Sequence, residues 1–507
     1  MSKTLIYEIN TRVWLNALSR HAARPVTLES VPDGVIAGLA ALGVTHIWLM
    51  GIWVRSSLAR KSALRYLDEY KTALPDVSPD DVIGSAYSIG KYEVAPEAGG
   101  RAGLAAFREA ALRHGMKIIL DYVPNHVGLD HPWVTGAADL CVRGTPELLD
   151  ARPGDFFKSI RPDGSAVITA HGRDPNFPPW NDTAQLNAFS HILRQAAIAT
   201  LSDIAVQADG VRCDMAMLML NEVFAKTWAG LVTTPAPGID FWEEVIPAVR
   251  RVNPDFLFIA EVYWNLESKL IEQGFDYAYD KRLYDRLLSE DVAGLKAHLA
   301  AAVDYQRHML RFIENHDEPR AAVDFAAGGG AKQKAAAAVC LTLPGAVLLH
   351  DGRLDGRRIK LPVQIGRDPD EPRDPALRAY YVRLLSQIVN KPEACGHWTL
   401  LESTGAVLAY VCSTPTEARL VVANITGSSQ HSTIRLTEAY GSHPLINVFT
   451  NQIFAPFGDR LEVDMPPYTT NIYEVELARP AQPTLANRLV DVARRTARWI
   501  KGDGPRG

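Results

Sequence analysis

Short apolar runs alternate with amphipathic helical stretches over most of this chain, and this alternation restricts the folds that it can adopt. Strands are expected at residues 5–13, 44–50, 116–120, 210–213, 256–260, 276–279, 309–313 and 346–349. Helical patterns separate the later runs, at residues 241–252, 281–303 and 331–341. Strands that alternate with helices run parallel and are joined by crossovers. Eight such units predict a closed (β/α)8 barrel, and an open doubly wound sheet is the structural alternative.

One helix and the strand after it show the expected boundary clearly. Leu104, Phe107 and Ala111 recur at helical spacing, and an apolar run begins at Met116. Gly115 lies between them, and a glycine in the left-handed conformation commonly ends a helix. We therefore expect this helix to end at Gly115.

Two segments interrupt the barrel pattern and define the expected domains. Residues 127–187 are rich in Pro, Gly, Asp and aromatic residues and are too long for an ordinary connection, so we expect a short inserted subdomain there. The barrel then comprises residues 1–126 and 188–390. Residues 391–478 contain short alternating runs that predict an antiparallel β-sandwich, to which we assign no catalysis.

The last segment, residues 479–507, is basic and follows the expected sandwich. Its pattern is compatible with an amphipathic helix on an anionic surface. A helix packed on its own protein and a frayed tail are the alternatives.

Composition excludes several classes of protein. The chain of 507 residues has 47% hydrophobic and 22% charged residues, as soluble globular proteins do, and its net charge of -5 argues against nucleic-acid binding. No unbroken apolar run approaches the roughly 20 residues that span a bilayer, so we expect no membrane span. The chain begins without a basic and apolar leader, and its five cysteines are scattered without a CxxC spacing. We therefore expect a cytoplasmic protein with a neutral or small substrate.

Acidic residues follow four of the apolar runs. They are Asp121 in IILDYVPNH, Asp214 in GVRCD, Glu261 in FLFIAE and Asp317 in FIENHD. A lone acidic residue after a strand is usually a helix cap or a turn residue. In a (β/α)8 barrel, however, the carboxyl ends of the strands form the active site. Four polar clusters in this position therefore predict a site built from several strands.

Taken in order, these four segments resemble the signature regions of the α-amylase family of retaining glycoside hydrolases and transglycosylases. The resemblance implies that Asp214 is the nucleophile and that Glu261 is the general acid and then the base. It implies that Asp317 stabilises the transition state. In this family an insertion after the third strand commonly overhangs the site, and a β-sandwich commonly follows the barrel.

The same resemblance assigns a set of substrate-binding residues. His126 and His316 match histidines that donate hydrogen bonds to the sugar, although a metal-ligand or buried structural role is the alternative for each. Tyr87 is a candidate stacking platform or an ordinary loop aromatic. Trp264 is a candidate to pack on the leaving-group sugar. Asp121, at the end of its strand, completes this set.

Two further residues have roles that depend on their surroundings. Arg212 stands two positions before Asp214 on the same strand, so it points to the same side and is expected to keep Asp214 ionised. A structural ion pair with another carboxylate is its alternative role. Asn125 matches a calcium ligand in many amylases, and a structural hydrogen-bonding role is equally compatible. The chemistry itself requires no cofactor.

The expected function is cleavage of α-glucosidic bonds in oligosaccharides or glucans through a covalent glycosyl-enzyme intermediate. Two carboxyl groups about 5 Å apart are sufficient for this double displacement. The main alternative is a transglycosylase, glucosyltransferase or isomerase of the same family, with trehalose- or sucrose-type substrates. An inactive carbohydrate-binding relative and a metal-assisted hydrolase on the same barrel are the competing classes.

Overall fold

The computed structural model describes residues 3–388, 396–414, 417–441, 443–456 and 458–476. Their contacts divide into two compact units, one within residues 2–390 and one within residues 391–507. We describe each unit by itself. The predicted basic tail at 479–507 lies outside the described residues.

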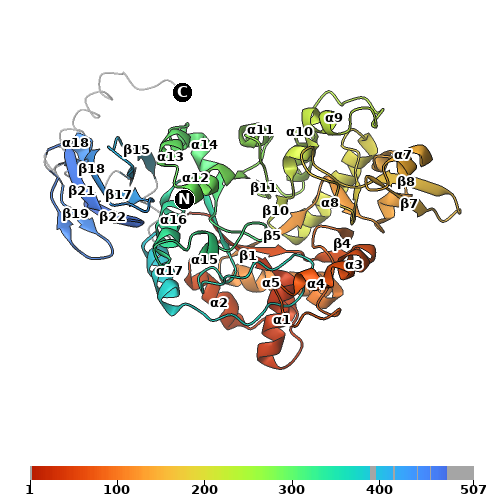
Figure 1. The fold of residues 1–507 in the computed structure, drawn as a ribbon, viewed down its shortest axis with the longest axis horizontal. Helices are drawn as coiled ribbons and strands as arrows, with labels where there is room; N and C mark the ends of the chain where they lie inside the picture. The colour runs from red at the N-terminus through yellow and green to blue at the C-terminus, as the bar shows by residue number, and fades with distance from the viewer. Residues whose placement is uncertain (1–2, 389–395, 415–416, 442, 457, 477–507) are drawn as a thin grey trace, which may run out of the picture. The chain divides into compact units, whose positions relative to one another are not determined.

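The first unit is a closed barrel of eight parallel strands in the order β1-β14-β13-β12-β11-β10-β5-β2 (Figure 1). The strands are β1 (Leu5–Asn10), β2 (His46–Met50), β5 (Lys117–Tyr122), β10 (Gly210–Cys213), β11 (Leu257–Ala260), β12 (Tyr277–Tyr279), β13 (Met309–Arg311) and β14 (Ala346–His350). Most of their residues are buried, because helices cover the outside while side chains fill the inside. The predicted (β/α)8 barrel is confirmed.

Helices follow the barrel strands and cover them. The longer ones are α1 (Thr11–Ala22), α2 (Asp33–Ala41), α5 (Gly100–Arg113), α8 (His191–Gln207), α10 (Phe241–Arg250), α12 (Lys281–Ser289), α13 (Val292–Leu299), α16 (Ala331–Thr342) and α17 (Pro375–Ile388). Shorter helices are α3 (Ser57–Ala63), α4 (Leu67–Tyr70), α9 (Asn221–Thr227), α11 (Glu267–Glu272), α14 (Val303–Arg307) and α15 (Ala321–Asp324). As predicted, Gly115 follows the end of α5 with a φ of 75°.

Two element boundaries differ from the sequence-based prediction. The strand expected at 5–13 ends at Asn10, because the Asn10 side chain accepts a hydrogen bond from the Val13 amide and so caps α1. The helix expected at 281–303 is broken between α12 and α13. Glu290 takes a left-handed φ of 60° there, and Asp291 caps α13 by accepting a hydrogen bond of 2.8 Å from the Gly294 amide.

The segment expected as an insertion has its own small elements. They are β6 (His126–Gly128), α6 (Pro132–Thr135), α7 (Pro146–Ala151), β7 (Phe156–Ile160), β8 (Ala166–Ala170) and β9 (Thr183–Gln185). β6 pairs with β9 and β7 pairs with β8, both antiparallel. A further antiparallel pair, β3 (Trp53–Arg55) and β4 (Ile89–Val94), follows the second barrel strand.

The second unit is antiparallel. A six-stranded sheet has the order β15-β16-β17-β22-β19-β20, and β18 pairs with β21. The elements are β15 (His397–Leu400), β16 (Leu408–Ser413), β17 (Glu417–Asn424), β18 (Gln430–Arg435), α18 (Glu438–Gly441), β19 (Leu445–Asn447), β20 (Ile453–Phe454), β21 (Arg460–Met465) and β22 (Thr469–Glu476). Val422, Ile434 and Tyr473 share one core, which joins the two sheets and confirms the predicted antiparallel fold.

Membrane-spanning helices were sought over the residues that the structure describes. None of the helices there combines the length and the apolar character that crossing a bilayer requires.

Candidate active site

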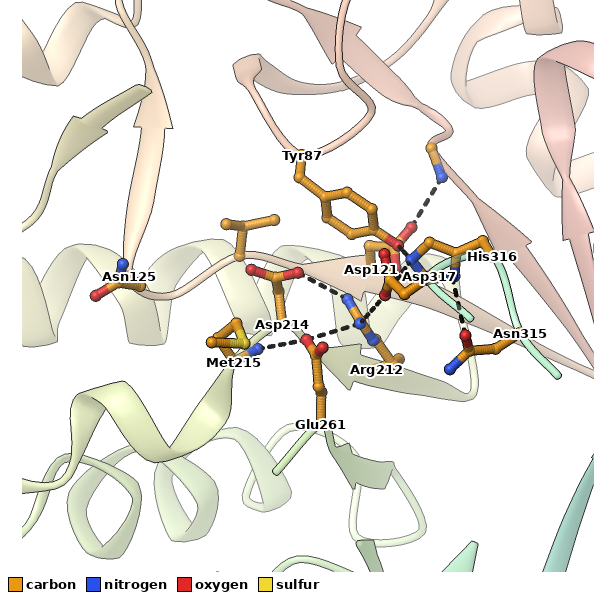
Figure 2. A network of polar contacts seen from close by, with 12 residues as sticks. Tyr87, Asp121, Asn125, Arg212, Asp214, Met215, Glu261, Asn315, His316 and Asp317 are labelled. Atoms are coloured by element: carbon orange, nitrogen blue, oxygen red, sulfur yellow. Dashed lines mark hydrogen bonds and ion pairs between the residues drawn. The ribbon is translucent and has the colours of Figure 1, made fainter. Parts of the chain in front are cut away.

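Asp214 and Glu261 follow the neighbouring strands β10 and β11, and both reach the guanidinium of Arg212 (Figure 2). Arg212 Nη1 lies 2.9 Å from Asp214 Oδ1, and Nη2 lies 2.7 Å from Glu261 Oε2. All three side chains are at least nine-tenths buried. One cation therefore holds two carboxylates from adjacent strands close together.

Asp317 approaches the same guanidinium from a third strand end, beyond β13. Its Oδ2 lies 3.7 Å from Arg212 Nη2 and 2.9 Å from His316 Nε2. Its side chain is 43% exposed, unlike those of Asp214 and Glu261, so it faces the solvent side of the cluster. This placement leaves Asp317 accessible to an incoming ligand.

Two groups donate hydrogen bonds to the carboxylate of Glu261. The Met215 amide donates a hydrogen bond of 2.7 Å to Oε2, and the Tyr263 hydroxyl donates one of 2.8 Å to Oε1. Met215 adopts a left-handed φ of 42°, an unfavourable conformation for a non-glycine residue that turns its amide toward the carboxylate. Both oxygens of Glu261 are thus occupied as acceptors.

The protonation of the two carboxylates differs from the expectation that Arg212 keeps Asp214 ionised. Burial, followed by the charge of Glu261, raises the pKa of Asp214 to about 8 despite the opposing effect of Arg212. Arg212 serves both carboxylates and so does not distinguish between them. Burial of Asp214 therefore favours its protonated form in this geometry.

His316 lies between Asp317 and Glu8, a residue of the barrel strand β1. Its Nδ1 contacts Oε1 of Glu8 on β1, and its Nε2 faces Asp317. Burial opposes protonation, but the charges of Asp317 and Glu8 outweigh it and raise the pKa of His316 to about 10. The charged imidazole in turn holds the pKa of Asp317 below its usual range against the effect of burial.

Aromatic rings surround the Arg212 guanidinium. Its central carbon lies 5.1 Å from the ring centroid of Tyr87, 5.3 Å from that of Trp48 and 5.6 Å from that of Tyr279. The Tyr87 hydroxyl lies 2.6 Å from His316 Nε2, and the two rings stack at 5.3 Å. Tyr87 is therefore part of the charged network and more than a loop aromatic.

His126 has an environment opposite to that of His316. It is 5% exposed, and its ring packs 5.0 Å from that of Trp180 in the insertion. Burial lowers the pKa of His126 to about 3, so the ring is neutral at physiological pH. A neutral ring donates through one nitrogen only.

Asp121 lies next to the cluster, but both of its oxygens are already engaged. Oδ1 accepts a hydrogen bond of 3.1 Å from Trp48 Nε1, and Oδ2 accepts one of 2.8 Å from the Gly51 amide. Burial raises its pKa to about 6. These contacts show that Asp121 stabilises the end of β2, while its predicted role in binding a sugar stays a prediction.

The surroundings of Asn125 bear on the two roles expected for it. Its Oδ1 accepts a hydrogen bond of 2.9 Å from Gln185 Nε2, and its Nδ2 lies 3.3 Å from Gln185 Oε1. Calcium requires six to eight oxygen ligands. Within the described ranges, no three His, Cys, Asp or Glu side chains are grouped so that they could hold a metal ion. The contacts of Asn125 support the structural hydrogen-bonding role, and the calcium role stays a prediction.

Trp264 lies on the loop after β11. It is 40% exposed, and both Trp264 and Asn265 adopt left-handed φ angles, of 63° and 62°. Such strain in a large aromatic residue persists only where the surrounding structure imposes it, and it occurs most often near functional sites. The exposed ring is available for contact with a ligand.

Three residues of the network were missed by sequence reasoning: Glu8, Met215 and Tyr263. A charged residue inside the apolar run that became β1 was a signal for Glu8. Tyr263 stands two residues after Glu261, a spacing that offered a weak signal. Met215 had none, because its backbone conformation depends on the tertiary fold.

One more contact reaches the site from the segment after β14, where the Lys360 ammonium donates to the backbone carbonyl of Asp317. The sequence pattern did not assign this residue. A polar segment far along the chain thus touches the acidic cluster.

Family models match both units of the chain. One described as "Alpha amylase, catalytic domain" matches residues 34–231, and one described as "Maltogenic Amylase, C-terminal domain" matches residues 399–472. α-Amylase MalA of Haloarcula japonica is 26% identical over 389 residues, which cover 72% of this chain and 50% of that protein. α-Amylase 3 of Dictyoglomus thermophilum is 22% identical over 302 residues, 55% of each chain. The chain thus spans about half the length of these two relatives.

Solved structures share the fold over almost the whole chain. The maltogenic α-amylase AmyB of Thermotoga neapolitana has a TM-score of 0.66 at 18% identity, covering 94% of this chain and 99% of its own. The α-amylase of Geobacillus thermoleovorans, solved with acarbose, has a TM-score of 0.65 at 18% identity, covering 94% and 98%. The two family models match one unit of the chain each, and the four motifs occur in the family order. The chain therefore belongs to the α-amylase family and carries a C-terminal domain of the maltogenic amylase type.

Proposed function

We propose that the protein is a retaining glycoside hydrolase that cleaves α-glucosidic bonds in oligosaccharides or glucans. The observation that carries this proposal is the pair Asp214 and Glu261, two buried carboxylates from adjacent strands that bind one guanidinium. A retaining mechanism needs two carboxyl groups about 5 Å apart, one to bond to the sugar and one to move a proton. Asp317 provides a third, more accessible acidic group beside them.

In the first step, Asp214 attacks the anomeric carbon while Glu261 gives its proton to the departing glycosidic oxygen. The bond between that carbon and oxygen breaks, and a covalent ester between Asp214 and the sugar forms. The productive state therefore has the proton on Glu261. Because burial favours the protonated form of Asp214, substrate binding must lower the pKa of Asp214 so that it can act as a charged nucleophile.

In the second step, Glu261, now a carboxylate, accepts a proton from water as the water oxygen attacks the anomeric carbon. The ester bond breaks and Asp214 is released as a carboxylate. Arg212 contacts both groups and stabilises negative charge on either of them through the cycle. A sugar acceptor in place of water gives transglycosylation by the same chemistry.

The remaining residues bind and orient the sugar. Asp317 is negatively charged and partly exposed, which suits a group that accepts sugar hydroxyls and stabilises an oxocarbenium-like transition state. His316 donates as a cation, while His126 interacts as a neutral ring. Trp264 offers an exposed aromatic face for a leaving-group sugar.

The relatives support the substrate class. The two curated proteins are α-amylases, one solved structure is of a maltogenic α-amylase, and another contains acarbose. A neutral glucan also agrees with the chain's mild net charge.

The test is product analysis with maltose, maltooligosaccharides, starch, trehalose and sucrose, with the anomeric form of the first product followed by NMR. The expected result is early release of the α anomer from maltooligosaccharides or starch. Early release of the β anomer would contradict retention, and longer or rearranged sugars would favour transfer or isomerisation. Absence of any product would favour an inactive carbohydrate-binding protein.

A further inference from the structure

Glu8 is a charged residue inside the barrel wall that the proposed mechanism does not use. It lies on β1 within the sequence LIYEIN and has no solvent exposure. Its Oε1 contacts His316 Nδ1, and its Oε2 has no hydrogen-bond partner among the residues that the structure describes. A buried carboxylate is unfavourable unless it is paired with a charge. His316 is therefore the partner that offsets the cost of burying a carboxyl group at this position.

His316 has a carboxylate oxygen at each of its two ring nitrogens. Nδ1 faces Glu8, while Nε2 lies 2.9 Å from Asp317 Oδ2 and 2.6 Å from the Tyr87 hydroxyl. A neutral imidazole has one N–H donor, and an imidazolium has two. Only the doubly protonated ring can donate to both carboxylates at once.

We propose that Glu8 is a positioning residue that keeps His316 doubly protonated, and that His316 in turn keeps Asp317 ionised and oriented. The roles of His316 and Asp317 in sugar binding rest on the proposed function, whereas the state of the imidazole does not. Glu8 acts on the site indirectly: it contacts His316, and His316 contacts Asp317, the partly exposed acid of the site.

The other charged groups around His316 do not replace Glu8. Asp121 also interacts electrostatically with His316, but that carboxylate is engaged by Trp48 and Gly51. His350 also faces it, but burial and nearby arginines keep the pKa of His350 well below the usual range. Arg212 and Lys360 act on Asp317 as cations, which does not favour a charge on His316. Glu8 and Asp317 are thus the two acids in direct contact.

The first experiment needs no substrate. Protein labelled with ¹⁵N-histidine is titrated by NMR, and the His316 signals are identified by their loss in His316→Gln. We expect both ring nitrogens of wild-type His316 to remain protonated at pH 8, and the midpoint to fall by at least about one pH unit in Glu8→Gln. A wild-type ring that is neutral at pH 8, or an unchanged midpoint in Glu8→Gln, overturns the proposal.

The second experiment uses activity. In Glu8→Gln, which keeps the size of the side chain, we expect the decline of kcat at high pH to begin at least about one pH unit lower than in the wild type, with little change in KM and with kcat recovering as the pH is lowered. An equal loss at every pH indicates a merely structural role and overturns the link to Asp317. If neither protein cleaves α-glucosides, the proposed function fails, while the NMR titration still decides the state of His316.

A matched control is available elsewhere in the same barrel. Asp280 and His298 form a second buried carboxylate–histidine pair, 2.8 Å apart. Asp280→Asn removes a similar buried charge, so we expect it to lower stability without moving the His316 titration. A His316 midpoint that shifts equally in Asp280→Asn and Glu8→Gln would show a general effect of barrel damage and contradict the proposal. If Glu8→Gln fails to fold, the wild-type titration still overturns the proposal when the His316 ring proves neutral at pH 8.

Discussion

Arg212 and Asp214 stand two residues apart at the end of β10, and Arg212 Nη1 lies 2.9 Å from Asp214 Oδ1. Alternate residues of a strand share a face, so this contact follows from the local sequence. The second nitrogen of the same guanidinium reaches Glu261, which arrives from a different strand. The barrel fold thus adds a carboxylate from a second strand to the local ion pair between Arg212 and Asp214.

Removing the nucleophile tests the role of Asp214. We expect Asp214→Asn to reduce kcat on maltooligosaccharides by on the order of a thousandfold or more, because an amide cannot form the covalent intermediate. Steady-state kinetics measures this loss. Asp209→Asn is the matched control: Asp209 precedes the other end of β10 and pairs with Arg108 at 2.7 Å. Near-normal turnover in Asp214→Asn would refute the assignment of roles.

The pH dependence of the unfolding free energy distinguishes the contribution of Asp214 from that of His316. Both have raised pKa values in the folded protein, about 8 for Asp214 and about 10 for His316. Each therefore stabilises the fold fully below its unfolded pKa, about 3.9 for Asp and about 6.5 for His, and this contribution is lost as the pH rises through the folded value. We expect Asp214→Asn to remove a decline in unfolding free energy between pH ~4 and ~8, and His316→Gln to remove one between ~6.5 and ~10.

Urea denaturation at a series of pH values measures both windows, and one retained proton changes the unfolding free energy by about 1.4 kcal/mol per pH unit. Each variant serves as the control for the other, because the two windows overlap only in part. Identical pH profiles for the wild type and both variants would mean that neither group titrates as described.

Loss of Arg212 leaves three carboxylates close together without their common cation. We expect Arg212→Met to lower the unfolding free energy by about 3 to 5 kcal/mol, the usual effect of breaking a buried ion pair. Arg108→Met removes a partly exposed arginine from its pair with Asp209 and should cost no more than about 1 kcal/mol. At high pH, where Asp214 would otherwise carry an uncompensated charge, adding Asp214→Asn to Arg212→Met should restore part of the stability. Equal losses in the two single variants would argue against the shared cation.

Trp264 is expected to affect substrate binding and not the fold. Trp264→Gly removes the exposed ring and relieves its left-handed backbone strain, so we expect unchanged or slightly raised stability. KM for maltooligosaccharides should rise roughly three- to tenfold through lost stacking. Leu112→Ala, at an apolar residue that is 66% exposed on α5, is the control and should change neither. An unchanged KM in Trp264→Gly would remove Trp264 from the binding site.

Much of the architecture was predictable because each barrel strand is a short apolar run and the acidic residues Asp121, Asp214, Glu261 and Asp317 lie at or just after the ends of such runs. Boundaries were less predictable: Asn10 ends β1 by capping α1, and Glu290 breaks a helix that the apolar periodicity continues. The local sequence is compatible with either backbone conformation at these two positions, and contacts with the surrounding structure decide between them. Glu8 is the instructive case, since its charge stood out in an apolar strand while its partner lies 308 residues away.

The chain's sequence by itself determined the alternation of strands and helices, the acidic residues at the strand ends and the order of the family motifs, because these depend on neighbouring residues. The tertiary structure alone decided how the pKa values of the buried groups shift. Asp214, expected to be ionised, has a pKa raised to about 8, because burial and a carboxylate from another strand act on it through space. His316 is charged and His126 neutral for the same reason: the electrostatic environment of a buried group comes from residues distant in sequence.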